Sequence, residues 1–472
     1  MLKQEIYPPT LSILEEKNLI TDAVDFALDH GLLIKQKDTG NIIHAPFSLF
    51  PSPVSRQAFQ NTVDIHTTLN KLFFKLSRDD IFIRKVMKSV IGVDNFMEKL
   101  FNIYTTVFDH DTNTQTISLG LNRSDYMLHS SENGLVPLQV EFNTISCGLV
   151  TLSSKVTELH QFVHKNDEEI LKNLPTCNSI EGVPKGISAA HRLFNSKYLK
   201  NEESVVLMVV QPNEWNMFDQ RGIEFKLLNK YGIKMMRKSL TEIFNEGKIA
   251  DGNLVIDNKI ISVVYFRAGY CPNDYPTEDE WTARLMMEKS SAVKSPDIAY
   301  HLVGLKKFQQ ILSCPNILKK YLTDPLELEK VRKTFTGLYP LDESEEGLAA
   351  YEMALNHPEK YVLKPQREGG GNNFYGNDIP LVLNKLSAAE RRCFILMDLI
   401  TPPTLQNLMV REGKISRQDV QSELGIFGVW LSDGEEVLIN EECGHLLRTK
   451  KSTSTEGGVS KGISVIDSPY LV

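Results

Sequence analysis

The sequence lacks the short motifs that identify several common classes of enzyme. It contains no G-x-x-x-x-G-K-[ST], no G-x-G-x-x-G and no H-E-x-x-H, and these absences disfavour P-loop NTPases, dinucleotide oxidoreductases and zinc proteases. One G-x-S-x-G occurs at 458–462. It lies in a polar loop before a predicted strand, whereas the nucleophile elbow of a hydrolase needs a strand before it and a helix after it. A serine hydrolase is therefore disfavoured as well.

Cysteine pairs, basic blocks and long apolar runs are also missing. The six cysteines form no C-x-x-C pair, which argues against zinc fingers and for reduced thiols. The 52 basic and 60 acidic residues give a net charge of −8 without a long block of either sign, so we expect no nucleic-acid or anionic-membrane surface. No signal-peptide core and no run of ~20 apolar residues occurs. These features predict a cytoplasmic protein with no nucleic-acid and no membrane partner.

What the sequence does contain is the composition of an ordinary globular protein, with 42% hydrophobic and 24% charged residues. Its 472 residues are enough for about three domains. Residues 11 to about 110 show helical spacing, strands begin near 115, and a separate α/β unit begins near 205. The sequence therefore predicts a mixed α/β protein.

The most informative stretch is 361–376, where a short apolar strand runs into glycines. Pro365 removes a backbone donor, so the strand should end there. Lys364 places a positive charge on the strand, and the carboxylate of Glu368 could share a Mg²⁺ ion with phosphate oxygens. Glycines let backbone N–H groups close over such oxygens, and this stretch contains three of them, Gly369, Gly370 and Gly371. We interpret the stretch as a nucleotide-phosphate site, with a solvent-facing lysine before a flexible loop as the alternative.

A second candidate lies in the predicted strand 135–145. Alternate residues of a strand share a face, so one face should carry the core residues Leu138, Val140 and Phe142. The opposite face should carry Gln139, Glu141 and Asn143. A carboxylate and an amide oxygen one step apart make a compact pair of ligands for Mg²⁺. A half-exposed strand with polar residues outside is the alternative.

Polar residues also gather at strand ends in the α/β unit. The buried strand 205–210 is followed by Glu214, Asn216 and Gln220, and the strand 260–266 by Arg267 and Tyr270. Ligands of open α/β sheets bind at the carboxyl ends of strands. This placement predicts a small polar ligand, and a surface ion pair is the alternative for Arg267.

The C-terminal third adds three features. The strand 393–398 could serve an adenine edge through its backbone. Glu423 opens another strand and could be a second acidic ligand or a ribose contact, with a capped strand end as the alternative. The Gly/Ser/Thr-rich loop between about 448 and 462 carries Arg448 and Lys450. Such a loop could close over a ligand and exclude water. A solvated hairpin loop is the alternative.

Together these stretches resemble eukaryotic glutathione synthetases, which are ATP-grasp ligases, over nearly the whole chain. The resemblance rests on 45–51, 218–221, 264–270 and 422–428, and on Leu121-Asn-Arg-Ser-Asp-Tyr126, Glu141-Phe-Asn-Thr-Ile-Ser146, Lys364-Pro-Gln-Arg-Glu-Gly-Gly-Gly-Asn-Asn373 and Gly444-His-Leu-Leu-Arg-Thr-Lys450. It implies an ATP-grasp fold with an inserted Rossmann-like parallel α/β substrate domain and a C-terminal lid loop. The expected divisions are 1–200 (N-terminal helices and the first part of the core), 201–304 (inserted domain) and 305–472 (nucleotide-binding part and lid).

The resemblance further implies a homodimer that joins γ-glutamylcysteine to glycine through an acyl phosphate, with ATP as co-substrate and one or two Mg²⁺ ions per subunit. The implied catalytic residues are Arg123, Lys364 and Arg448, and the implied metal ligands are Glu141, Asn143 and Glu368. For ATP the matching positions are Glu141, Lys306, Lys364, Glu368, Gly369, Gly370, Gly371, Asn372, Asn373, Tyr375, Met397, Asp398, Leu399, Ile400, Glu423, Lys450 and Glu456. For the other substrates they are Arg123, Ser146, Glu214, Asn216, Gln220, Arg267, Tyr270, Arg448, Val459 and Ser460.

The sequence departs from the family pattern at two places. The segment Ser146-Cys147-Gly148-Leu149 is shorter than in relatives and lacks a second serine, and Val459-Ser460 stands where relatives that use glycine have Val-Ala. An added hydroxyl beside the acceptor amino acid could change its preference. Two alternatives therefore accompany the synthetase hypothesis: a sister ligase that accepts β-alanine or serine, and a catalytically silent regulator that binds nucleotide or thiol.

Overall fold

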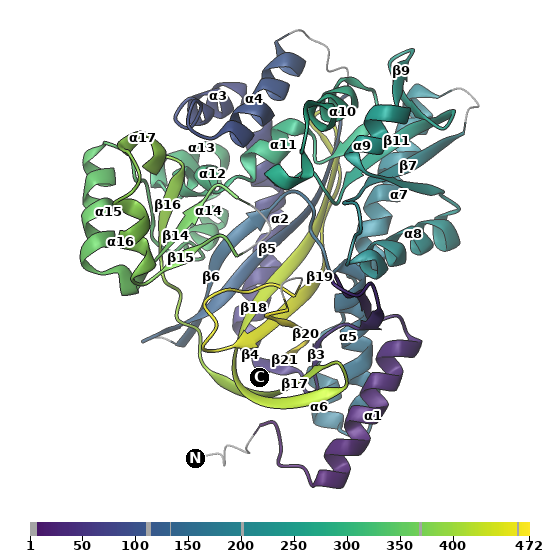
Figure 1. Ribbon diagram of the computed structural model, residues 1–472, viewed down its shortest axis with the longest axis vertical. Helices are drawn as coiled ribbons and strands as arrows, with labels where there is room; N and C mark the ends of the chain where they lie inside the picture. The colour runs from purple at the N-terminus through teal and green to yellow at the C-terminus, as the bar shows by residue number, and fades with distance from the viewer. Residues whose placement is uncertain (1–6, 110–114, 133, 200–202, 368–370, 460–461) are drawn as a thin grey trace.

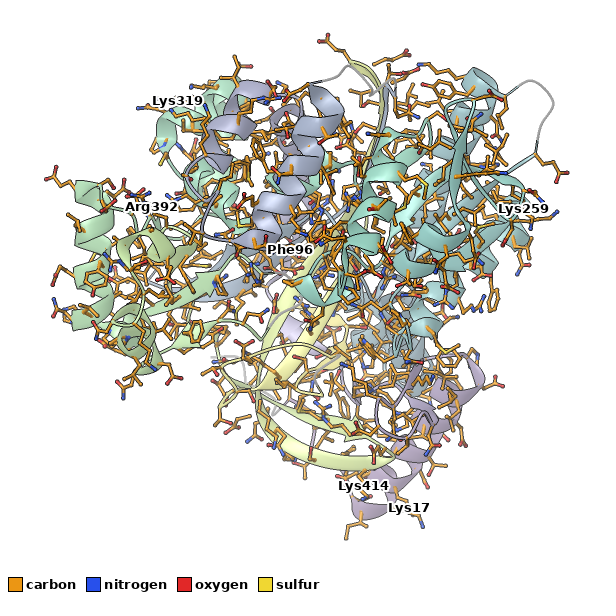
Figure 2. All side chains as sticks on the ribbon, turned by 45° about the horizontal axis from the view of Figure 1, so that its top comes forward. Lys17, Phe96, Lys259, Lys319, Arg392 and Lys414 are labelled. Atoms are coloured by element: carbon orange, nitrogen blue, oxygen red, sulfur yellow. The ribbon has the colours of Figure 1, made fainter. Side chains whose placement is uncertain are left out.

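The computed structural model describes residues 7–109, 115–132, 134–199, 203–367, 371–459 and 462–472. The predictions for Glu368, Gly369, Gly370 and Ser460 therefore lie outside the described residues. Surface lysines such as Lys17, Lys259, Lys319 and Lys414 are exposed, whereas Phe96 is buried (Figure 2). No helix of the described part is both long and apolar enough to cross a bilayer.

A seven-stranded sheet runs through the centre of the molecule (Figure 1). Its order is β17 (Leu405–Arg411), β3 (Phe47–Ser48), β20 (Val465–Asp467), β19 (Glu436–Lys451), β18 (Lys414–Asp433), β5 (Ile117–Ser131) and β6 (Gly134–Asn143). Two long helices pack on its opposite faces, because Gly428 of β18 faces His66 of α2 (Arg56–Ser77) and the next residue, Val429, faces Gly186 of α7 (Ser179–Tyr198). The apolar stripe of α2, which includes Leu69, is buried against the sheet.

A second sheet has a parallel part made of β8, β7, β11 and β12 and an antiparallel hairpin of β10 and β9. The strands are β7 (Ser204–Val209), β8 (Met235–Lys238), β9 (Lys248–Ala250), β10 (Asn253–Ile256), β11 (Lys259–Phe266) and β12 (Val293–Ser295), with helices α8 (Met217–Tyr231), α9 (Leu240–Glu246) and α10 (Glu278–Lys289). The apolar run of β7 is buried, as a parallel strand requires. The strand β8 begins only at Met235, because Gly232 ends α8 with φ +69°.

A third, antiparallel sheet has the order β13 (Leu338–Tyr339), β16 (Phe394–Asp398), β14 (Tyr361–Pro365) and β15 (Phe374–Tyr375). The prediction that the strand with Lys364 ends at Pro365 is confirmed. One face of this sheet, with Leu363 and Leu396, is covered by α15 (Glu345–Asn356) and α16 (Asp378–Leu383). The other face carries Val362 and Met397 toward β6. The third sheet thus faces the central one.

The other elements are short or peripheral. Gly92 has φ +83° and Asp94 caps the helix that follows, so 80–87 and 95–108 form two separate helices. The remaining helices are α1 (Ile13–Asp29), α3 (Asp80–Met87), α4 (Asn95–Phe108), α5 (Val150–Val163), α6 (Glu168–Asn173), α11 (Ile298–Val303), α12 (Lys306–Leu312), α13 (Pro315–Tyr321), α14 (Pro325–Arg332) and α17 (Ala388–Arg391). The small strands are β1 (Leu33–Lys35), β2 (Ile42–His44), β4 (Ser52–Val54) and β21 (Pro469–Leu471).

One buried carboxylate, at the end of β20, connects this strand to its neighbours and makes stability depend on pH. Asp467 accepts hydrogen bonds from Ser52 Oγ (2.6 Å), Thr449 Oγ1 (2.6 Å) and the amide of Ser468 (2.7 Å). Burial nevertheless raises the pKa of Asp467 to about 6. Since this folded-state pKa lies above the unfolded value near 4, the stabilisation that comes from the protonated form is lost as pH rises from about 4 through 6.

We therefore expect the Asp467→Asn variant to gain stability relative to the wild type by about 3 kcal/mol as pH rises across that interval. Urea denaturation of both proteins at several pH values measures this difference. A difference that stays constant with pH would contradict the prediction.

Candidate functional site

A cavity of about 760 Å³ opens between the central sheet, the third sheet and the ends of the parallel strands. Most of the predicted site residues that the structure describes line it, from Met397–Ile400 at one end to Arg267 and Tyr270 at the other. Two described residues, Gln220 and Gly371, are not part of its lining. The cavity therefore brings the predicted nucleotide and substrate positions into one continuous space.

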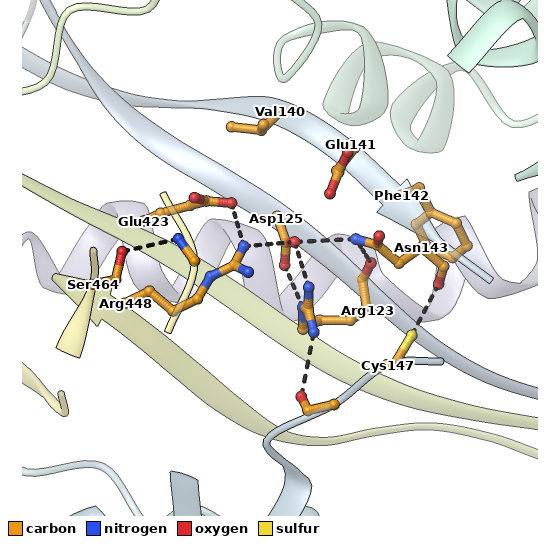
Figure 3. A network of polar contacts seen from close by, with 12 residues as sticks. Arg123, Asp125, Val140, Glu141, Phe142, Asn143, Cys147, Glu423, Arg448 and Ser464 are labelled. Carbon is orange, nitrogen blue, oxygen red and sulfur yellow. Dashed lines mark hydrogen bonds and ion pairs between the residues drawn. The ribbon is translucent and has the colours of Figure 1, made fainter. Parts of the chain in front are cut away.

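Two arginines that line the cavity, Arg123 and Arg448, are held by the carboxylates of Asp125 and Glu423 (Figure 3). Arg123 makes a bidentate pair with Asp125, through Nε at 2.6 Å and Nη2 at 2.8 Å. Arg448 reaches from β19 and donates to Asp125 Oδ2 at 3.0 Å and to Glu423 Oε1 at 2.5 Å. Burial raises the pKa of Glu423, although Arg448 lies beside it. The cluster thus holds two fixed guanidinium groups beside an open space.

The next part of the wall carries Glu141 and two buried lysines. Lys306 Nζ lies 3.4 Å from Glu141 Oε2 and donates to the carbonyl of Arg367 at 2.8 Å. Lys364 Nζ donates to the carbonyl of Val140 at 3.1 Å. Burial alone would raise the pKa of Glu141, but the attraction of nearby cations, led by Lys306 and Lys364, lowers it to about 2. The site therefore holds a carboxylate whose ionised form is favoured by two nearby ammonium groups.

The strand alternation predicted for 138–143 is only half right. Phe142 is buried and stacks on Phe73, while Glu141 and Asn143 line the cavity, as expected. Leu138 and Val140, however, face the third sheet rather than the core behind β6. The reason is a β-bulge in β6. Asp125 pairs with Glu141, but the next residue of β5, Tyr126, pairs with Gln139, so Val140 has no partner on β5. The residues before the bulge therefore point to the opposite faces from those that simple alternation predicts. Gln139 is accordingly buried.

The chemistry of Glu141 and Asn143 is compatible with a bound Mg²⁺. The amide nitrogen of Asn143 donates to the carbonyl of Arg123 (3.3 Å) and to Asp125 Oδ2 (3.0 Å), which leaves its oxygen for a ligand. The Glu141 side chain keeps 23% of its surface exposed to the cavity. Within the described ranges no group of three His, Cys, Asp or Glu side chains could hold a metal alone. Two oxygen donors suit Mg²⁺, which usually retains water and phosphate ligands.

The end of the cavity near the parallel strands is organised by Arg267. Its Nη1 pairs with Asp219 at 3.0 Å, and both side chains are buried. Asp219 also accepts from the amides of Leu149 (2.9 Å) and Thr151 (2.7 Å), so it caps α5 from outside the helix. A Cβ on Gly148 would lie 2.9 Å from Arg267 Nη2. The short loop 146–149 therefore lies directly against the guanidinium group.

Polar atoms without partners point to a ligand at this end. Arg267 Nε and Asn216 Oδ1 are buried and have no hydrogen-bond partner among the described residues. Glu214 accepts from the amide of Asn216 at 3.0 Å and from Gln220 Nε2 at 2.7 Å. Gln220 thus contacts Glu214 and does not line the cavity. Since buried polar groups are normally paired, a polar ligand would complete this wall.

The loop after β19 covers part of the cavity. Lys450 Nζ donates to the carbonyl of Thr455 at 2.8 Å, and burial lowers the pKa of Lys450. The amide of Gly458 donates to Ser464 Oγ at 3.1 Å, which closes the base of the loop. Thr455, Glu456 and Val459 all line the cavity. The described part of the predicted lid therefore already lies over the site.

The sequence interpretation missed two buried acids that hold the arginines. Asp125 follows Arg123 by two residues on one strand, so their common face was a usable signal. Asp219 had no such signal, because its partners Leu149, Thr151 and Arg267 are distant in sequence. The apolar part of the lining was also missed; it includes Met127, Trp215 and Val362.

Comparison with known proteins gives a consistent result over the whole chain. The family model described as eukaryotic glutathione synthase, ATP binding domain, matches residues 14–471. Glutathione synthetase of Xenopus laevis is 40% identical, with 100% of this chain and 99% of that protein covered. The enzymes of Dictyostelium discoideum (39%; 97% and 100% covered) and Homo sapiens (40%; 98% and 99% covered) are similarly close.

A solved structure gives the same picture for the fold. The apo form of a glutathione synthetase-like effector from Globodera pallida superposes with a TM-score of 0.78 at 24% identity, and the match covers 99% of this chain and 100% of that one. The mixed α/β fold class predicted from the sequence is confirmed, and the arrangement is consistent with an ATP-grasp fold.

Proposed function

The chain belongs to the eukaryotic glutathione synthase family, and from this membership we propose how its cavity works. The protein is an ATP-dependent ligase, a glutathione synthetase. In this reaction the carboxylate of γ-glutamylcysteine becomes an acyl phosphate, which the amine of glycine then attacks. The observation that supports the proposal is one continuous cavity, which is lined by Lys306, Lys364 and Glu141 and also by Arg123 and Arg267.

We place ATP between the central and third sheets. The apolar side chains of Val362, Met397 and Ile400 would enclose the adenine ring, and Lys306 and Lys364 would meet the phosphates. Both lysines are almost fully buried, so their charges act in a medium that screens them weakly. The predicted contacts of Asn372, Asn373, Tyr375, Glu423, Lys450 and Glu456 belong to the same proposal.

We propose that Mg²⁺ binds at Glu141 and Asn143, with the predicted ligand Glu368 outside the described residues. The ion would neutralise charge on the phosphate oxygens as the phosphoryl group transfers. The chain itself supplies the remaining positive charge through Lys306, Lys364 and Arg448.

We place γ-glutamylcysteine at the other end of the cavity. Arg267, with its unpaired Nε, would bind a carboxylate of the substrate, while Glu214 and the Asn216 oxygen would accept from its ammonium group. Arg123 would orient the carboxylate that is activated. When both ends of γ-glutamylcysteine are held, its reacting carboxylate would lie beside the terminal phosphate of ATP. The reaction between two bound substrates is then effectively intramolecular.

The loop around Val459 would bind glycine and keep water from the acyl phosphate. Ser460 adds a hydroxyl at this position of the sequence. The identity of the acceptor amino acid should therefore be measured first.

We expect purified protein to release ADP with ATP, Mg²⁺ and γ-glutamylcysteine, and to do so fastest with glycine. A coupled assay that compares glycine, β-alanine, serine and no acceptor measures this. Faster turnover with β-alanine or serine would contradict the glycine assignment. Folded protein that binds ATP but turns over no acceptor would support the silent regulator instead.

Three further properties belong to the proposal. A homodimer follows from the family resemblance and can be measured by sedimentation equilibrium. A cytoplasmic location can be measured with a fluorescent fusion. Domain boundaries near 200 and 304 can be measured by limited proteolysis, and the six-stranded sheet, built between Ser204 and Ser295, supports them.

A further inference from the structure

Asp125 lies where the three parts of the active site meet. Its side chain is fully buried, and its Oδ2 accepts from three groups: Arg123 at 2.8 Å, Arg448 at 3.0 Å and the Asn143 amide at 3.0 Å. Its Oδ1 accepts from Arg123 Nε at 2.6 Å. Figure 3 shows the carboxylate at the centre of this network. The Asp125 carboxylate therefore connects three residues of the proposed site. They are Arg123 at the γ-glutamylcysteine end, Arg448 on β19 before the lid loop, and the proposed metal ligand Asn143.

The backbone opposite Asp125 is shaped to admit this network. Gly425 of β18 pairs with Asp125 across the central sheet. A Cβ on Gly425 would lie 2.8 Å from Asp125 Oδ1 and 2.8 Å from Arg123 Cδ, closer than side chains normally approach. The absence of a side chain at Gly425 therefore gives the ion pair the space it occupies.

The charges explain why such a group is needed. Arg123 and Arg448 would repel each other if both approached the same anionic substrate without a shared counter-ion. A guanidinium group held by two hydrogen bonds keeps one orientation, whereas a free one samples many. Glu423 also accepts from Arg448, but it lies on the other side of that guanidinium group from Asp125.

We propose that Asp125 is a positioning residue that sets the orientation of Arg123, Arg448 and Asn143 together. It couples binding of γ-glutamylcysteine to the geometry of the transfer step. The adenine pocket, formed by Val362, Met397 and Ile400, lies outside its reach. This inference rests on the proposed function of the same cavity.

The test is a kinetic comparison of wild type and Asp125→Asn, which keeps the shape but loses the charge. We expect kcat to fall about 30-fold and KM for γ-glutamylcysteine to rise about tenfold, since charge-assisted bonds are lost. The dissociation constant of a non-hydrolysable ATP analogue should stay within about twofold, because adenine contacts are kept. If Asp125 had only a structural role, kcat would fall, and both KM for γ-glutamylcysteine and the dissociation constant of the ATP analogue would rise. Unchanged kcat and KM in a folded variant would overturn the proposal.

A second variant keeps the proposal testable if Asp125→Asn does not fold. Gly425→Ala should displace the pair and raise KM for γ-glutamylcysteine without weakening ATP binding, and normal kinetics for this variant would overturn the proposal. Asp433→Asn, which removes the partner of Lys197 at the far end of β18, is the matched control and should leave kinetics unchanged.

The proposed function is tested separately by the wild type. If the wild type shows no turnover, that function fails, and the positioning role is decided by a crystal structure of Asp125→Asn. Rotated Arg123 and Arg448 side chains would then support the role, and unmoved ones would overturn it.

Discussion

The Glu141→Gln variant is expected to lose about a thousandfold in kcat/KM for ATP, the effect of removing a charged group that acts in the transition state. Glu141 lies between Lys306 and Lys364 and is a proposed Mg²⁺ ligand. Without its charge the repulsion between the two ammonium groups would no longer be offset, and the proposed Mg²⁺ ion would lose an anionic donor. Steady-state assays over a range of Mg²⁺ concentrations measure the loss, which higher Mg²⁺ should partly restore.

The pH dependence of Glu141 provides a separate check. Because its pKa is lowered to about 2, Glu141 is ionised at every pH above 4, and its stabilising contribution is lost only as pH falls below the unfolded value toward 2. The pH profile of kcat/KM should therefore show no ionisation of Glu141 between pH 5 and 9. Glu158→Gln, which removes the partner of Lys155 on α5, is the matched control and should leave activity unchanged. Retained activity in Glu141→Gln would rule out its role in metal binding.

The sequence predicted most clearly those features that depend on local pattern. The strand that ends at Pro365 and the buried parallel strand β7 follow from backbone chemistry and apolar runs, and both are present. The bulge at Val140 could not be predicted, because it is a property of the pairing with β5 and not of the strand itself. Alternation counted through the bulge therefore gave the wrong face for Leu138, Gln139 and Val140.

The same distinction applies to the site. The position of Arg267 after a strand end, where it lines the cavity, was predictable from the topology of α/β sheets. The acids that hold them were not, because Asp219 reaches Arg267 and the start of α5 only after the chain has folded. When the two partners of a buried ion pair lie on different elements, the periodicity of the sequence does not predict the pair.

The largest effect on both binding and stability is expected from Arg267→Ala. KM for γ-glutamylcysteine should rise about a hundredfold, since the proposed charge-assisted contact with the substrate would be lost. The free energy of unfolding should fall by about 3 kcal/mol, near the lower end of the range for breaking a buried ion pair. The lower end applies because Asp219 keeps backbone donors from Leu149 and Thr151. Initial rates and urea denaturation measure the two effects. Lys230→Ala, an exposed partner of Glu181, is the control and should change neither.

A double-mutant cycle separates the two roles of Arg267. In Asp219→Asn the guanidinium group loses its charged anchor but keeps its charge for the substrate, so KM should rise less than in Arg267→Lys, which loses the planar fork. If Asp219 acts only by orienting Arg267, the double variant should have the same KM as Arg267→Lys alone. Additive effects on KM would instead mean that Asp219 influences substrate binding through the loop 146–149, whose backbone it also holds. The shortened loop would then be a determinant of substrate binding in its own right.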